Sequence, residues 1–109
     1  ATIPQGAGAF AQVSKEARYT LTYDENKTGT ISNLTIGGQP IDPDKTYRMA
    51  TNDYLASGGD GYTVLTRNFE SFNTSMLLSD VVIQYVQTLN QPVEPIIDGR
   101  LTVVNGVTP

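Results

Sequence analysis

The segment at residues 52–62 combines residue types that could hold a small polar ligand. Tyr54 offers an aromatic face that can stack on a flat ring, and Asp60 offers a carboxylate that can accept hydrogen bonds from hydroxyl groups. Three glycines surround this acid, among them Gly58 and Gly59, and glycine reaches backbone angles that other residues avoid. Tight turns contain glycines for purely structural reasons as well. The residue types therefore leave a binding loop and a structural turn both open.

The composition excludes several other chemistries. The chain has 109 residues with no Cys and no His, and its 7 Lys+Arg against 11 Asp+Glu give a net charge of −4. Without Cys there is no disulfide framework, thiol nucleophile or zinc ribbon, and without His there is no Ser-His-Asp triad. The negative charge argues against nucleic acid or an anionic membrane as the main partner. No apolar run reaches the roughly 18 residues that a membrane span needs.

Alternation of apolar and polar residues predicts the strands that must position this segment. Residues 18–36 are expected to form a β-hairpin whose turn lies at 24–29, because aromatic and β-branched residues alternate on both sides of typical turn residues. Residues 46–51 alternate in the same way and are predicted to be a strand. A closing strand is expected over residues 99–104.

Helical spacing predicts one main helix over residues 79–89. Its apolar positions share one face: Leu78, Val82, Tyr85, Val86 and Leu89. Asn90 and Pro92 supply its end. Residues 52–57 are expected to make a short helical turn, and residues 62–65 a short extended segment. We therefore expect an α+β fold, mostly antiparallel strands with one main helix, forming a single domain over residues 1–109.

The turn at residues 24–29 also begins like an EF-hand calcium loop. Oxygen-bearing side chains occupy its first, third and fifth positions, and Gly29 occupies the sixth. However, the twelfth position, which should be a bidentate Glu, is Thr35, and the flanking segments are predicted strands rather than helices. These departures favour a plain hairpin turn over a calcium site.

Two further patterns have simple explanations. Asn26, Asn33 and Asn73 each begin an N-glycosylation triplet, although a chain rich in Asn and Thr contains such triplets by chance.

Arg18 and Arg100 could each reach a phosphate group. Because the four arginines are scattered along the chain, solvated or ion-paired roles are favoured for both.

Residues 46–62 closely resemble the signature of the 5′-nucleotidase C-terminal domain family. An extended segment ends in Asn52, an aromatic residue follows two positions later, and a Gly-Gly-Asp-Gly-aromatic run completes the signature. The flanking stretches at residues 8–14, 42–45 and 98–101 are similar to the family as well. The resemblance thus covers nearly all of the chain.

The resemblance implies a substrate-binding role for this segment. In the family, the aromatic residue before Gly-Gly-Asp-Gly stacks on a nucleobase, and the Asp binds the ribose hydroxyls. Tyr54 would then stack on the base and Asp60 would hold the ribose, with Asn52, Gly58 and Gly59 in the same binding segment. The family usually has Phe at the stacking position, so Tyr54 is a departure.

The resemblance also implies that catalysis lies outside this chain. Two divalent metal ions are expected in a separate N-terminal metallophosphoesterase domain, and no catalytic residue, metal or cofactor is expected here. The chain would be the later portion of the C-terminal domain, with a second stacking aromatic and phosphate-binding arginines preceding Ala1.

The expected partners are a nucleotide or nucleoside and that N-terminal domain, in a periplasmic, secreted or cell-surface protein that removes phosphate from nucleotides. The alternative is a non-catalytic structural or interaction module with the same fold.

Overall fold

The structure is a computed structural model that describes residues 10–68 and 70–106. The chain divides into two compact units. We call the first, Ala1–Tyr47 with Ile97–Pro109, the sheet unit, and the second, Arg48–Ile96, the helical unit. The start of the stretch at residues 8–14 lies outside the described residues, and the expectation of one domain over residues 1–109 stays a prediction.

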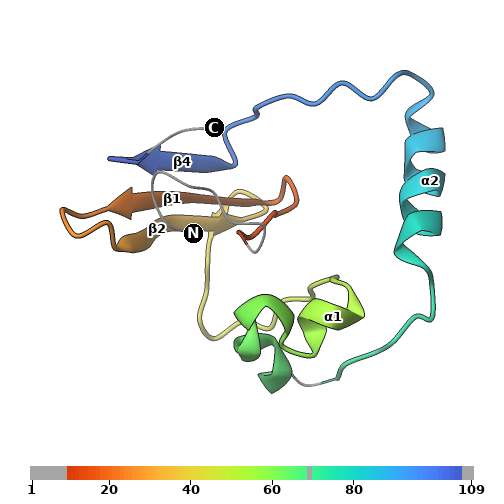
Figure 1. The fold of residues 1–109 in the computed structure, drawn as a ribbon, viewed down its shortest axis with the longest axis horizontal. Helices are drawn as coiled ribbons and strands as arrows, with labels where there is room; N and C mark the ends of the chain where they lie inside the picture. Colours follow the sequence, from red (N-terminus) through yellow and green to blue (C-terminus); the bar gives the residue numbers. More distant parts are fainter. Residues whose placement is uncertain (1–9, 69, 107–109) are drawn as a thin grey trace. The chain divides into compact units, whose positions relative to one another are not determined.

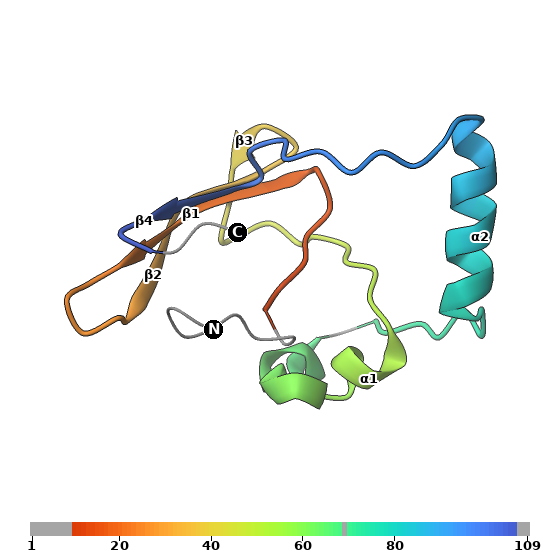
Figure 2. The same cartoon turned by 45° about the horizontal axis from the view of Figure 1, so that its top comes forward.

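The sheet unit contains a four-stranded sheet in the order β3-β2-β1-β4, and all four strands are labelled in Figure 2. Its strands are β1 (Ala17–Tyr23), β2 (Gly29–Ile36), β3 (Gln39–Pro40) and β4 (Leu101–Val104). β1 pairs with β2 and β2 with β3 in antiparallel fashion, whereas β4 runs parallel to β1. Figures 1 and 2 both show β4 beside β1. The predicted hairpin and α+β class are confirmed, and the closing strand begins two residues later than expected.

β1 carries the core of the sheet unit. Leu21 and Tyr23 are buried, with exposed fractions of 9% and 7%. The alternation in this strand places Tyr19 on the same face, as predicted. An open groove of about 290 Å³ runs along the face. Its lining residues are Phe10, Ala11, Tyr19, Leu21, Tyr23, Gly29 and Ile31.

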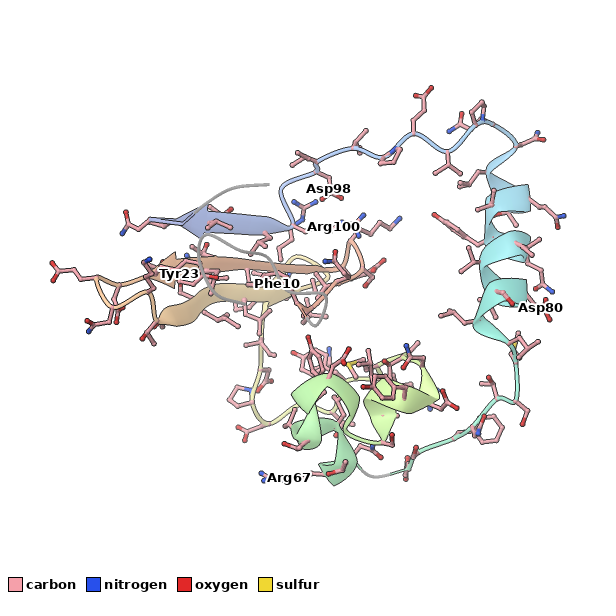
Figure 3. The ribbon with its side chains drawn as sticks, in the orientation of Figure 1. Phe10, Tyr23, Arg67, Asp80, Asp98 and Arg100 are labelled. Atoms are coloured by element: carbon pink, nitrogen blue, oxygen red, sulfur yellow. The ribbon has the colours of Figure 1, made fainter. Side chains whose placement is uncertain are left out.

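Polar contacts join the segment at the start of β4 to the start of β1. Figure 3 shows two of the residues involved, Asp98 and Arg100, just before β4. The Nε of Arg100 donates to both carboxylate oxygens of Asp98, at 2.8 and 3.0 Å, and its Nη1 donates to the carbonyl of Val13 at 2.9 Å. Arg18 Nη1 donates to the carbonyl of Asp98, and the Tyr19 N–H donates to the carbonyl of Arg100, each at 2.9 Å. Arg100 is therefore ion-paired, as the sequence favoured.

The hairpin turn is built around Asp24. Its Oδ1 accepts hydrogen bonds from the backbone N–H groups of Asn26 and Thr28, both at 2.9 Å. Lys27 adopts a left-handed φ of 62°, and its N–H donates to the carbonyl of Asp24. The carboxylate therefore closes the turn, as Asp side chains commonly do.

The described residues of the helical unit form two α-helices and two 3₁₀ helices. They are α1 (Asp53–Ala56), η1 (Gly59–Gly61), η2 (Thr63–Arg67) and α2 (Leu78–Leu89). α2 begins one residue before the predicted helix and ends at Asn90 with a left-handed φ of 55°. Its side chains are exposed up to Thr88. None of the helices in the described part of the chain is long and apolar enough to cross a membrane.

Two local predictions were wrong. Residues 46–51 form no strand, because a strand needs a neighbour for its ladder hydrogen bonds and no described segment pairs with these residues. The alternating Tyr47 and Met49 are instead exposed. The segment expected to be extended at residues 62–65 lies mostly in η2, where the Leu65 N–H donates to the carbonyl of Tyr62.

Acidification is expected to weaken the sheet unit through Asp98. The hydrogen bond from Arg100 is the main cause that lowers the pKa of Asp98 below its ordinary value of 3.8. Because the pKa is lower in the folded chain, the carboxylate stabilises the fold above its unfolded-state pKa, and this stabilisation is lost as the pH falls through the folded-state value. The urea midpoint of the wild-type chain should therefore fall between about pH 5 and pH 2, and that of Asp98→Asn should fall less.

Far-ultraviolet circular dichroism measures these midpoints. Glu16→Gln is the matched control, because the pKa of Glu16 is also lowered, chiefly by a hydrogen bond with the Ser14 side chain, and Glu16 takes no part in the Arg100 ion pair. The urea midpoint of the Glu16→Gln chain should still show the part of the fall on acidification that depends on Asp98. Identical pH dependence in the wild-type and Asp98→Asn chains would contradict the prediction.

Candidate functional site

Asn52 begins the predicted binding segment by capping α1. Its backbone is extended, with φ −84° and ψ 165°, and its Oδ1 accepts a hydrogen bond of 2.8 Å from the Leu55 N–H. This is the usual geometry of an Asn at a helix N-cap. The cap holds Tyr54 in the first turn of α1, so Asn52 has a structural task, and its contact with a substrate stays a prediction.

The glycine run after α1 adopts the special backbone angles that the sequence predicted. Gly58, Asp60 and Gly61 all have positive φ, at 96°, 55° and 83°. Asp is among the few residues other than glycine that tolerate this region. The left-handed steps turn the chain back after α1, so that the side chain of Asp60 meets Tyr54.

Gly59 is required for a different reason, namely the closeness of the Tyr54 ring. A Cβ atom at Gly59 would lie 2.6 Å from Cε2, from Cζ and from the carbonyl oxygen of Tyr54. No side chain fits at that distance. The ring therefore lies directly on the backbone of Gly59, while Tyr54 remains 58% exposed and open to solvent.

The structure brings the two predicted ligand-binding side chains together. The Tyr54 hydroxyl donates a hydrogen bond of 3.1 Å to Oδ1 of Asp60, and both side chains are exposed. The exposed aromatic ring of Tyr54 and the carboxylate of Asp60 are thus adjacent. The sequence reasoning placed both residues in one segment but missed this bond. The signal was the Tyr itself, since the Phe usual in the resembling family has no hydroxyl.

Ser57 and Thr66 support this arrangement and were also missed. Ser57 Oγ donates to the carbonyl of Tyr54 at 2.8 Å, and the methyl group of Thr66 would lie 3.3 Å from a Cβ at Gly58. A Ser that bonds back to the carbonyl three residues earlier is a common local pattern. The position of Ser57 at the end of the predicted helical turn could have indicated this bond.

The match to a protein family decides the identity of this segment. The family model for the 5′-nucleotidase C-terminal domain matches residues 2–67, which include all five predicted site residues. The chain belongs to this family.

Relatives of the 5′-nucleotidase C-terminal domain agree with that assignment. "Protein UshA" of Escherichia coli (strain K12) is 44% identical over 61 residues, or 56% of this chain. A "5'-nucleotidase" of Vibrio vulnificus is 35% identical over 94 residues, or 86% of it. The "Trifunctional nucleotide phosphoesterase protein YfkN" of Bacillus subtilis is 29% identical over 104 residues, or 91% of it.

The matched regions are small parts of these relatives. The chain spans 11%, 16% and 7% of the lengths of the three proteins, in the same order. No solved structure matches the chain significantly.

The metal ions implied by the family resemblance do not fit the residues present here. Within residues 10–68 and 70–106, no group of three or more His, Cys, Asp or Glu side chains could hold a metal ion. His and Cys, the usual nitrogen and sulfur ligands, do not occur in the chain.

Gly59→Ala is expected to displace the Tyr54 ring. The new Cβ would overlap the ring and the Tyr54 carbonyl, so the side chain must move, at a cost of about 1–3 kcal/mol for an overpacked contact. The two-dimensional ¹H–¹³C NMR signals of the Tyr54 ring should shift.

Gly61→Ala is the matched control, because a Cβ there meets nothing within 4 Å although its φ is +83°. It should strain the backbone and shift the ring signals less. Equal shifts in the two variants would show that the ring does not depend on the space at Gly59.

Proposed function

We propose that this chain recognises the base and ribose of a nucleotide, as part of a longer hydrolase of the 5′-nucleotidase type that removes phosphate from nucleotides. The observation that carries the proposal is the pairing of an exposed aromatic ring at Tyr54 with a carboxylate at Asp60. Membership of the 5′-nucleotidase C-terminal domain family supports it. So do the printed names of the relatives, which include a 5′-nucleotidase and a nucleotide phosphoesterase.

The chemistry of the two side chains suits a nucleoside. A nucleoside joins a flat aromatic base directly to a sugar with hydroxyl groups. An aromatic side chain stacks on such a base, and a carboxylate accepts hydrogen bonds from the sugar hydroxyls. Because the ring of Tyr54 and the carboxylate of Asp60 are adjacent, one ligand could contact both at once. Gly58 and Gly59 shape the loop that holds them.

Catalysis in this proposal belongs to an N-terminal metallophosphoesterase domain. Two divalent metal ions there would activate water and stabilise the phosphoryl transition state. The present chain would hold the base and ribose, and so place the scissile phosphate at those metals. By itself it would not hydrolyse nucleotides. We propose a periplasmic, secreted or cell-surface location, on the family resemblance.

A structural or interaction module is the second candidate, and one observation favours it. Among the described residues, the side-chain hydrogen bonds found for Asn52, Tyr54 and Asp60 are made within the segment itself. Such contacts stabilise a loop whether or not a ligand binds. A ligand titration separates the two functions.

Adenosine should bind at Tyr54. Titration into the 109-residue chain should shift the NMR signals of the Tyr54 ring and of the backbone amides of residues 58–61. Tyr54→Ala should raise Kd about 5- to 150-fold, because stacking of a base on an aromatic side chain is worth about 1–3 kcal/mol.

Tyr85→Ala is the matched control, because this tyrosine on α2 is 63% exposed against 58% for Tyr54. It should leave Kd unchanged. No perturbation of the wild-type chain at millimolar adenosine, or equal affinity in the wild-type and Tyr54→Ala chains, would favour the structural module.

A further inference from the structure

The hydroxyl of Tyr54 makes a contact that a stacking ring does not need. Its 3.1 Å hydrogen bond to Oδ1 of Asp60 links residues six positions apart and joins the first turn of α1 to η1. Phenylalanine at this position would stack equally well but could not form the bond. The hydroxyl of Tyr54 therefore contributes to the position of the Asp60 carboxylate rather than to stacking on a base.

The bond leaves most of the carboxylate available. An ionised carboxylate can accept about four hydrogen bonds, two on each oxygen. Tyr54 uses one position on Oδ1, and among the described residues no other hydrogen bond to the Asp60 carboxylate is found. Asp60 is exposed, so the remaining positions on its carboxylate are open to a ligand from solvent as far as the described residues are concerned.

We propose that the Tyr54 hydroxyl is a positioning group that holds the Asp60 carboxylate in place, so that Oδ2 accepts hydrogen bonds from the vicinal diol of a ribose. This inference rests on the proposed function and adds a specificity determinant to it. The hydroxyl makes the site favour nucleosides with two neighbouring sugar hydroxyls over those without them.

The physical reason is the cost of ordering a side chain on an exposed loop. A carboxylate that rotates freely must lose that freedom when a ligand binds, and a side chain fixed beforehand avoids the loss. Here the Asp60 side chain is held in place by three successive local contacts. Asn52 caps α1, the Tyr54 ring lies on Gly59, and the hydroxyl then holds Asp60.

The test compares Tyr54→Phe with wild type, using adenosine and 2′,3′-dideoxyadenosine as probes. The Phe variant keeps the stacking ring, so the Kd for dideoxyadenosine should change by less than about twofold, the usual limit of additivity between independent groups. The Kd for adenosine should rise about 3- to 10-fold, in line with the cost of ordering one side chain on binding. In an Asp60→Asn background, Tyr54→Phe should no longer change the ratio of the two Kd values.

A measurement without ligand gives a second readout. Three-bond NMR couplings should show one χ1 rotamer for Asp60 in the wild-type chain and averaged rotamers in Tyr54→Phe. Asp53, which is exposed in the first turn of α1, is the internal control and should keep its couplings.

The outcomes separate the inference from the proposed function. Equal weakening of both nucleosides in Tyr54→Phe would overturn the inference, and so would unchanged or tighter adenosine binding or an unchanged Asp60 rotamer. Adenosine binding that Tyr54→Ala weakens as predicted would still uphold the proposed function in each of those cases. A wild-type chain that binds no adenosine would overturn both.

Discussion

The parallel pairing of β1 with β4 is the contact on which the chain's organisation depends. It joins Tyr19 to Leu101 and continues along both strands, so the two ends of the described chain meet in one sheet. Parallel strands need a long crossover connection. That connection contains the whole helical unit, including residues 52–62. The contacts of Arg100 with Asp98 and with the carbonyl of Val13 hold the start of this pairing.

The candidate site, by contrast, is assembled from contacts between near neighbours in the sequence. The cap at Asn52, the close approach of Tyr54 to Gly59 and the bond to Asp60 all lie within nine consecutive residues. Its geometry therefore comes from the segment itself, while the sheet supplies the scaffold from which the segment leaves and to which the chain returns. Ligand-binding residues are often arranged in this way on loops.

Elements whose signals are local could be predicted from the sequence. The hairpin at residues 18–36 follows from alternation with Asp24 in its turn, and α2 follows from an apolar repeat that Asn90 ends. The strand predicted at residues 46–51 shows the limit of such signals. Alternation describes which side chains could share a face, but a strand also needs a neighbouring strand, and alternation carries no information about one.

The sequence by itself determined the family and the chemical groups available for binding, because Tyr54, Asp60 and the surrounding glycines are recognised by identity and order. The absence of His and Cys also excludes whole classes of catalytic and metal site. Only the three-dimensional structure decided how those groups meet within the segment. Glycine at positions 58 and 61 permits left-handed angles without imposing them, and the bond from Tyr54 to Asp60 exists because the folded backbone adopts them. The parallel pairing of β4 with β1, whose other edge is taken by β2, likewise joins residues far apart in the sequence.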